Sequence, residues 1–447
     1  MSDIAAGYTF VDGEKGITAT KLNNIVAGAV IQPSFVTGQP ASSTLDPTDN
    51  LLEVKSGGTY ARITGSQLIS SVGSQVDVTS QITALRLRSF SAIGNGTFEC
   101  DQRTAFTGVS NSGWALDRWS LSRTGTMTGT AIGTPGVVQV PNTSFDITQS
   151  FLRVTLTGQE VSLGAADFWV LQQAVEGPVM RELYDDVHSL ALLVRSSVAT
   201  LKFGVALRDG AATTSRSLTK LVTLGAANTW TLISLASIPS FHSTTPTTAW
   251  SLAPGTAGYF LNITLACGTT YTSAANDVWQ TGNFLGATGQ SNFAAQAVNS
   301  TLDIAFVQHS PGSNTDLMDL SFGQNLDGPF GCLRYYAKSY PYGTKAGTSS
   351  VAAGLQPCIP ATPASGGTTS SVLLVNGIFP KVMAKAPTVV SYGYTGVTNA
   401  VTAAGGSDSS VTSVGQIGDR AFGVYSLSAA VPINVNFNGH WTADTGW

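Results

Sequence analysis

The chain has 447 residues, of which 22 are basic and 26 acidic, and its formal net charge is -4. This length predicts about three domains, each large enough to bury its own core. Charged residues make up only 11% of the chain, against about 25% in ordinary soluble domains. So low a charge favours a protein that hides much of its surface in an assembly. Because Lys and Arg are not in excess and form no basic run, we expect no nucleic-acid partner.

The first part of the chain, residues 1–85, combines short helix signals with a hairpin. Thr20 can cap a short helix, and residues 67–76 carry a weak helical stripe. Between them, residues 51–63 (LLEVKSGGTYARI) predict a β-hairpin that turns at residues 56–58. The start, MSDIAAGYTF, has neither the cationic lead nor the apolar core of a signal peptide, so we expect no export through a secretory pathway.

The second part, residues 86–328, alternates strand signals with clusters of Gly, Ser, Thr and Asn. Segments with a helical period are almost absent, which predicts a two-sheet sandwich of the jelly-roll type. The clearest strand signals lie at 168–175, 190–194, 201–208, 229–235 and 259–265.

Two local patterns in this part predict buried positions. Leu302, Ile304 and Phe306 fall two apart, so we expect them on one buried face of a strand, which the Pro311 and Gly312 pair ends. Asp117 and Arg118, beside Trp119, are expected to form a buried, hydrogen-bonded structural pair.

The third part, residues 329–447, has a Pro, Gly, Ser and Thr stretch at 343–371 and then further strand signals. We expect a second, smaller β-sandwich there. The fold class is therefore all-β: a small N-terminal region with short helices and a hairpin, a jelly-roll β-sandwich and a smaller β-sandwich. The most apolar stretch, 190–207, is interrupted by Arg195 and Lys202, so we expect no membrane insertion.

Motifs that carry chemistry are few in this chain. The histidines lack zinc-site spacing, and there is no nucleophile elbow or Walker-type phosphate loop, so we expect no catalytic residue, no metal site and no cofactor. A polysaccharide depolymerase would need two facing carboxylates. The candidates are Asp185, Asp186, Asp303, Asp316 and Asp319, and the sequence brings no two of them together. The four cysteines are far apart and are expected to be buried thiols of a protein made in a reducing cytoplasm.

Tryptophans offer the best candidates for binding. Trp114, Trp250, Trp279, Trp441 and Trp447 lie among Gly, Ser and Thr, a context typical of loops and chain ends. A tryptophan presents a flat apolar face that can stack on a sugar ring. We predict that Trp250, Trp279 and Trp441 bind a ligand. The alternative is that these rings are packing anchors or subunit contacts.

One long segment resembles a known family. Residues 279–340 contain a tryptophan-led loop, a strand ending in Gln308-x-x-x-Gly312, a polar linker and the sequence CLRYY at 332–336. This order resembles a segment common in bacteriophage tail-fibre and related virion fibre proteins. The chain has His309 and Ser310 where the commonest version has a Leu-Glu pair.

Five further segments resemble parts of the same proteins. Residues 116–119 (LDRW), with 172–177 and 190–195, are similar to the carbohydrate-binding-module jelly rolls that phage fibres carry. Residues 377–390 and 437–444 resemble the last domain of many phage fibres.

The resemblance implies a phage virion fibre, with a tail fibre as the first expectation. It implies a homotrimer that is not an enzyme and is assembled in the host bacterial cytoplasm. Residues 1–85 would attach to other virion proteins, and the sandwiches would adhere to host surface glycans through many weak contacts. Two alternatives stay open: a head fibre, decoration or connector-associated structural protein, and a polysaccharide depolymerase.

Overall fold

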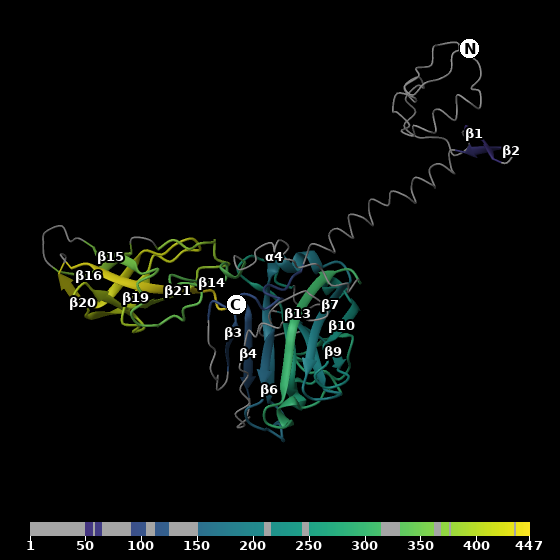
Figure 1. Cartoon of the computed structure of the whole chain (residues 1–447), viewed down its shortest axis with the longest axis horizontal. Helices are drawn as coiled ribbons and strands as arrows, with labels where there is room; N and C mark the ends of the chain where they lie inside the picture. Colours follow the sequence, from purple (N-terminus) through teal and green to yellow (C-terminus); the bar gives the residue numbers. More distant parts are fainter. Residues whose placement is uncertain are drawn as a thin grey trace, which may run out of the picture. The chain divides into compact units, whose positions relative to one another are not determined.

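The computed structural model describes residues 50–56, 59–64, 91–103, 112–124, 151–209, 216–243, 250–313, 331–361, 368–374, 377–432 and 435–447. The chain divides into two compact units, Met1–Leu85 and Arg86–Trp447. Strands dominate both of them in the described parts (Figure 1), so the all-β prediction is confirmed.

The described part of the first unit is a β-hairpin. Strands β1 (Asn50–Ser56) and β2 (Thr59–Thr64) pair antiparallel, with Ser56 opposite Thr59. Two glycines connect them, as two-residue hairpin turns favour. The hairpin prediction is confirmed. The helix signals around Thr20 and at 67–76 lie outside the described residues.

Within the second unit, the described residues between 91 and 313 form a sandwich of two antiparallel sheets, here called the first sandwich. One sheet has the order β12-β9-β8-β11-β6-β4-β3 and the other the order β10-β7-β13-β5. Their bounds are β3 (Ser112–Leu116), β4 (Trp119–Thr124), β5 (Leu152–Thr155), β6 (Phe168–Glu176), β7 (His188–Ser196), β8 (Lys202–Asp209), β9 (Arg216–Thr223), β10 (Thr231–Ile238), β11 (Ala257–Cys267), β12 (Trp279–Thr281) and β13 (Thr301–Pro311).

Short helical turns connect some of these strands. The short α-helix α4 (Gly177–Met180) follows β6 and has a proline in its first turn. The 3₁₀ turns are η2 (Arg181–Leu183), η3 (Phe241–Ser243), η4 (Thr269–Tyr271) and η5 (Phe293–Ala295).

The core of the first sandwich lies between its two sheets. Leucines of β7 and β13 pack there against Leu171 of β6, Leu207 of β8 and Ile263 of β11. Each of the five predicted strand segments overlaps an observed strand, β6, β7, β8, β10 or β11.

One prediction about β13 is wrong. Leu302 and Ile304 point into this core, but Phe306 belongs to a separate cluster with Phe151 and Leu193. The reason is a shift in register against β7 between Ile304 and Phe306. An extra residue in a strand moves the following side chains to the opposite face.

The described residues from 331 to 447 form a second antiparallel structure, here called the second sandwich. Its order is β14-β21-β15-β16-β20-β19-β18, and β17 and β18 also pair with β21. The bounds are β14 (Tyr336–Lys338), β15 (Gln356–Pro360), β16 (Thr368–Leu374), β17 (Thr388–Tyr392), β18 (Ala400–Ala403), β19 (Asp408–Gly415), β20 (Val424–Pro432) and β21 (Phe437–Asp444). Its own core includes Met383, Tyr425 and Trp441.

Strand β21 is shared between two sets of partners. Its first residues, 437–439, pair with β15 and β18, and its second half pairs with β14 and β17. The second half therefore lies between two short strands, and together these three strands form one wall of the site described next.

Candidate functional site

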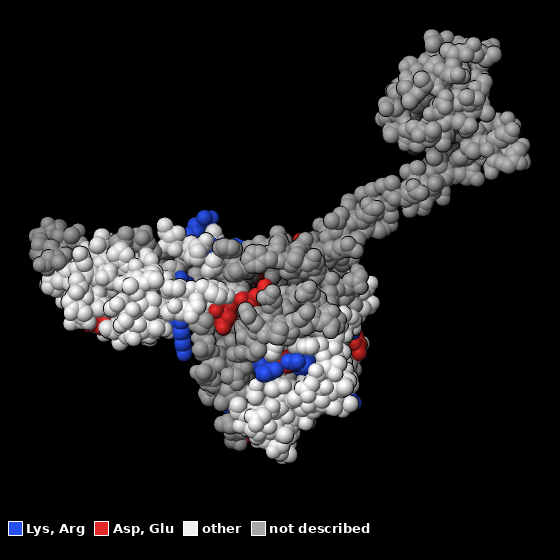
Figure 2. Space-filling model, viewed as in Figure 1, with Lys and Arg blue, Asp and Glu red and all other residues white. Residues whose placement is uncertain are grey.

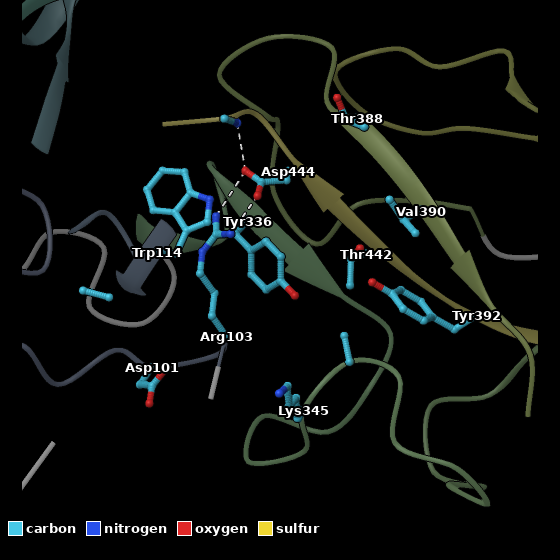
Figure 3. Close-up of a pocket in the computed structure, with 13 residues that line it drawn as sticks. Asp101, Arg103, Trp114, Tyr336, Lys345, Thr388, Val390, Tyr392, Thr442 and Asp444 are labelled. Carbon is cyan, nitrogen blue, oxygen red and sulfur yellow. Dashed lines mark hydrogen bonds and ion pairs between the residues drawn. The ribbon is translucent and has the colours of Figure 1, made fainter. Parts of the chain in front are cut away.

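A cavity of about 680 Å³ opens where the first and second sandwiches meet, and it is here called the junction pocket (Figure 3). The first sandwich contributes residues before and within β3. The second contributes β14, β17, β21 and a loop. The lining residues are Asp101, Arg103, Trp114, Ala115, Tyr336, Lys345, Ala346, Thr388, Val390, Tyr392, Thr442, Asp444 and Gly446.

Strand alternation explains which side chains reach the pocket. On β17, Thr388, Val390 and Tyr392 line it, whereas the intervening Val389 and Ser391 are buried on the opposite face. Val390 is paired with Thr442, another lining residue, on β21. The wall therefore presents polar and apolar groups along β17 and two polar side chains, Thr442 and Asp444, along β21.

Arg103 is the best-fixed side chain of the pocket. Its Nη1 donates to Asp444 Oδ2 at 2.7 Å and its Nη2 to Asp444 Oδ1 at 3.1 Å. Its guanidinium carbon lies 4.0 Å from the ring centroids of both Trp114 and Tyr336, and Figure 3 shows it between the two rings. A planar guanidinium suits both the carboxylate fork and the aromatic faces. One side chain thus connects two sandwiches and orders two rings.

Asp444 is held from a second direction. The N–H of Gly446 donates to its Oδ1 at 2.8 Å. Gly446 has a φ of +77°, a conformation that glycine adopts without a steric penalty. Asp444 therefore has little freedom to turn away from Arg103.

Lys338 fastens the segments behind the pocket. Its ammonium donates to the carbonyl oxygens of Gln102, Tyr342 and Thr344. Burial lowers the pKa of Lys338 to about 8, because a buried ammonium loses its hydration. Three carbonyl acceptors at one cation hold residues of both sandwiches in a fixed relation.

A second contact between the sandwiches surrounds Glu176 at the end of β6. Its carboxylate, almost fully buried, accepts two hydrogen bonds from Arg334 at 2.7 and 3.0 Å and one from the Tyr335 hydroxyl at 3.1 Å. Burial opposes ionisation of Glu176, but the hydrogen bonds and charge of Arg334 outweigh it and the pKa is lowered. The Arg-Tyr-Tyr sequence at 334–336 is thus an interface between two modules, as its aromatic and arginine content indicates.

The Asp117 and Arg118 pair is only partly as predicted. Both residues are buried. However, Arg118 donates to the Ala174 carbonyl at 2.5 Å and lies over the Tyr335 ring, whereas Asp117 accepts from Gln102. They are therefore structural residues with separate partners.

The three tryptophans predicted to bind a ligand are packed into the two cores. Trp250 is 5% exposed and its indole N–H donates to the Phe241 carbonyl. Trp279 on β12 is half-buried and donates to the Pro239 carbonyl. Trp441 is 4% exposed and packs edge-on against Phe379 and Phe422. The structure brings none of these rings into the junction pocket, and their ligand-binding role remains a prediction.

The remaining tryptophans and several of the candidate aspartates lie at different places in the structure. Trp114 lines the junction pocket, and Trp447 stacks on Tyr335. Asp303 is buried between Arg153 and Arg195, at 2.7 and 2.6 Å, and both its oxygens accept hydrogen bonds. Asp316 and Asp319 lie outside the described residues.

No local sequence pattern points to the other lining residues. Arg103 and Asp444 are 341 positions apart in the chain, and no local pattern connects them. Tyr336 carried the only usable signal, because it belongs to the Arg-Tyr-Tyr sequence. No cluster of three or more His, Cys, Asp or Glu side chains that could hold a metal ion occurs in the described part of the chain. No helix there is long and apolar enough to cross a membrane.

Comparisons with known proteins identify no family for this chain. No protein-family model and no curated protein matches the chain. Two solved structures are similar to parts of it. A Bacteroides thetaiotaomicron protein provisionally described as sugar binding has 9% identity and a TM-score of 0.26, covering 50% of this chain and 100% of its own. A family 30 carbohydrate binding module has 10% identity and a TM-score of 0.24, covering 48% of this chain and 93% of its own. Likenesses at these scores carry no argument about this chain.

Proposed function

We propose that this chain is a bacteriophage virion fibre, in the first place a tail fibre, which adheres to host surface glycans without catalysis through the junction pocket. The observation that carries the glycan part is the set of groups in that pocket: aromatic rings, a fixed arginine and carboxylate pair, and threonine and lysine side chains. The fibre part rests on the residue order in 279–340 and on the low charge of the chain.

The chemistry of the pocket suits a sugar. A pyranose ring has an apolar face that packs on an aromatic ring and an edge of hydroxyl groups that exchange hydrogen bonds. Tyr392 is half-buried, so part of its ring faces the cavity, and Thr388 and Lys345 are exposed beside it. A volume of about 680 Å³ lies within the range of small-ligand sites, roughly 300–1,000 Å³. The pocket can hold a saccharide with both kinds of contact.

The surface agrees with binding of a weakly charged or neutral partner. On the described part of the face in Figure 2, charged side chains are few and scattered. A single shallow sugar site binds at about 1 mM, or about -4 kcal/mol. Linking several such sites on one particle adds a factor of about 100 to 10,000. Adhesion would therefore depend on copy number, which fits the proposed homotrimer and the proposed attachment of residues 1–85 to other virion proteins.

The first test is a glycan screen with the purified full-length chain and two tyrosine variants. Tyr392→Ala removes a ring from the pocket wall. Tyr394→Ala removes an exposed tyrosine two positions further along, outside the pocket, and is the matched control. We expect binding at high micromolar concentration that Tyr392→Ala lowers at least tenfold and Tyr394→Ala leaves unchanged. Absence of any binding, or equal loss in both variants, would reject the glycan proposal.

The structural alternative, a head fibre, decoration or connector-associated protein, is favoured by one observation. The three predicted tryptophans pack against the two cores, with Trp250 and Trp441 buried and Trp279 partly buried. Cryo-electron microscopy of the virion separates the two roles. Density for this chain at the tail supports host adhesion, whereas density lying against the capsid supports the structural role.

A further inference from the structure

Three charged side chains form a row across the sheet β10-β7-β13-β5 of the first sandwich. Asp303 of β13 lies directly opposite Arg153 of β5 on one side and Arg195 of β7 on the other. The neighbours of Asp303 in the chain, Leu302 and Ile304, point into the core. By strand alternation the row therefore lies on the outer face of this sheet. It is here called the arginine row.

Both arginines bind the same carboxylate. Arg153 donates from Nε to Asp303 Oδ1 at 2.7 Å and from Nη2 to Oδ2 at 2.9 Å. Arg195 donates from Nε and from Nη2 to Oδ2, at 3.0 and 2.6 Å. Because the Nη2 groups of both arginines meet at one oxygen, the two guanidinium groups lie side by side. Asp303 balances only one of their two charges, so the row keeps a positive charge.

Each guanidinium also keeps donors that the protein does not use. The side chain has five N–H groups in a planar fork, and Nη1 of Arg153 and of Arg195 has no hydrogen-bond partner among the described residues. The two side chains are 35% and 23% exposed, whereas Asp303 is 2% exposed. The unused N–H groups can therefore reach a ligand, while the carboxylate that orients them stays covered.

Arg334, at the contact between the sandwiches, shows the opposite case. Its Nε and Nη2 donate to the Glu176 carboxylate, and its Nη1 donates to the Val382 carbonyl at 3.3 Å. One carboxylate balances one guanidinium there, and every nitrogen has a partner. Such a pair is complete as a structural contact. The arginine row has more charge and more donors than the structural contact with Asp303 requires.

Aromatic rings hold the guanidinium groups of the arginine row in position. The guanidinium carbon of Arg195 lies 4.6 Å from the Trp230 ring centroid and 5.5 Å from that of Phe151, and that of Arg153 lies 5.1 Å from Phe151. Phe151 is buried in a cluster with Phe306, and Trp230 packs against this cluster. Side chains that are already fixed lose little entropy when they bind a ligand.

Two hydroxyl groups lie beside the arginine row. Thr155 and Thr301 are opposite each other on β5 and β13, each two positions from a member of the row, so they share its face of the sheet. Both are partly buried. A threonine hydroxyl can donate one hydrogen bond to an anion. The outer face therefore offers guanidinium and hydroxyl donors to the same place.

We propose that the arginine row binds the phosphate group of a ligand. Nη1 of Arg153 and of Arg195 would be the main donors, and the hydroxyls of Thr155 and Thr301 would add to them. A phosphate directs its oxygens several ways, so it can accept from both guanidinium groups at once, whereas the two oxygens of a carboxylate match a single fork. None of these residues lines the junction pocket, so the inference does not depend on glycan binding there.

A phosphate group can belong to a soluble molecule or to a lipid headgroup, and the first test distinguishes these sources. The full-length chain is titrated at constant ionic strength with inorganic phosphate, with acetate and with phosphatidylcholine vesicles that contain or lack phosphatidylglycerol. We expect phosphate to bind with a Kd of about 1 mM and acetate at least about tenfold more weakly. Additional binding to the phosphatidylglycerol vesicles alone assigns the site to a lipid headgroup, and phosphate binding without it assigns the site to soluble phosphates.

Two variants that each remove one positive charge from the first sandwich test the position of the site. Arg195→Gln leaves Arg153 and Asp303 as a balanced pair and should weaken phosphate binding at least about tenfold. Arg181→Gln is the matched control, because Arg181 is exposed and its Nη2 donates to the Leu252 carbonyl. It should leave phosphate binding unchanged. Equal weakening by both variants would show a general attraction of charge and overturn the proposal.

A measurement on the unaltered chain removes any doubt about folding of the variants. Phenylglyoxal modifies accessible guanidinium groups, and peptide mass spectrometry follows each arginine separately. Phosphate should slow the modification of Arg153 and Arg195 severalfold and leave that of Arg181 unchanged. The proposal is overturned if phosphate protects neither arginine of the row, if it protects Arg181 equally or if acetate binds as tightly as phosphate. Tyr392→Ala, in the junction pocket, should not change phosphate binding, so a failure of the glycan proposal is a separate result.

Discussion

Two groups of aromatic side chains in the second unit differ in what their rings face. The closed aromatic cluster of the first sandwich consists of Phe241 with Trp250, Tyr259 and Trp279 around it, at centroid distances of 5.0 to 5.4 Å. The junction pocket has Trp114, Tyr336 and Tyr392. In the closed cluster each ring packs against other rings. In the junction pocket a cation and open space separate them.

The polar ends of the rings show why one group is closed. Both indole N–H groups of the closed cluster donate to backbone carbonyls of the chain itself, Phe241 and Pro239. The Tyr259 hydroxyl contacts His309 at 2.5 Å, and His309 contacts His188 at 2.7 Å. The two indoles, the Tyr259 hydroxyl and both ring nitrogens of His309 therefore have hydrogen-bond partners within the chain. A ligand site needs side chains that are fixed in position and still have hydrogen-bonding capacity. In the junction pocket, Tyr392, Thr388 and Lys345 are such side chains.

Truncation in the closed cluster should have the largest effect. Phe241 has no exposed surface, so Phe241→Ala leaves a cavity among the three rings around it and should lower the free energy of unfolding by about 3–5 kcal/mol. Tyr392→Ala in the junction pocket should cost clearly less, because that ring is only half-buried. Urea denaturation of both variants measures the difference. Equal losses would show that the two groups are alike in packing.

The second largest expected effect is that of acid, which should destabilise the closed cluster. Burial lowers the pKa of His188 to about 3 and that of His309 well below its usual value. Below pH 6.5 the unfolded chain binds protons that the folded chain does not, so stability falls as the pH falls through this range. Burial raises the pKa of Asp117 to about 6, which acts in the opposite direction between about pH 6 and 4. Burial also lowers the pKa of His440, so three histidines oppose one aspartate and we expect a net loss of at least about 2 kcal/mol between pH 6.5 and 5.

Urea denaturation across this pH range, with His188→Gln beside the native chain, isolates the histidine contribution. The substitution removes a group that titrates only in the unfolded chain, so its curve should be flatter. An unchanged slope would mean that the buried histidines do not govern the acid response.

In the junction pocket, loss of the ion pair between Arg103 and Asp444 should lower the free energy of unfolding. Asp444→Asn keeps the shape but leaves Arg103 without its charged partner, and we expect a loss of about 1–2 kcal/mol. Asp277→Asn is the matched control, because its 2.6 Å pair with Lys220 is 65% exposed on the aspartate side and should cost under about 0.5 kcal/mol. Thermal and urea unfolding compare the two. A loss no greater than the control would remove Arg103 as the fixed centre of the pocket.

The strands of the fold could be predicted because their signal is local. Alternation and turn residues indicate β6, β7, β8, β10 and β11, and the hairpin of β1 and β2 follows from its two glycines. The face of Phe306 could not be predicted, because a bulge is a property of the pairing with β7 and not of the β13 sequence alone.

The site could be predicted much less well. A context of Gly, Ser and Thr suggests a loop, but it does not determine what covers the ring. The neighbours of Trp441, Phe379 and Phe422, come from other parts of the second sandwich. Arg103 becomes part of a site only when folding brings Asp444 to it. A pocket that forms between two modules takes its residues from distant parts of the chain, so no single stretch of sequence predicts it.

The smallest expected effect is that of replacing Lys345. This prediction rests on the proposed glycan binding. This exposed lysine lines the junction pocket, so Lys345→Ala should leave stability unchanged. If the bound sugar carries a carboxylate, affinity should fall by about threefold to tenfold, and the loss should shrink in high salt because an exposed charge is screened. Lys202→Ala, at an exposed position of β8 away from the pocket lining, is the control. Equal affinity of the native chain and Lys345→Ala for acidic sugars would leave a neutral saccharide as the ligand, held by the aromatic wall and the threonines alone.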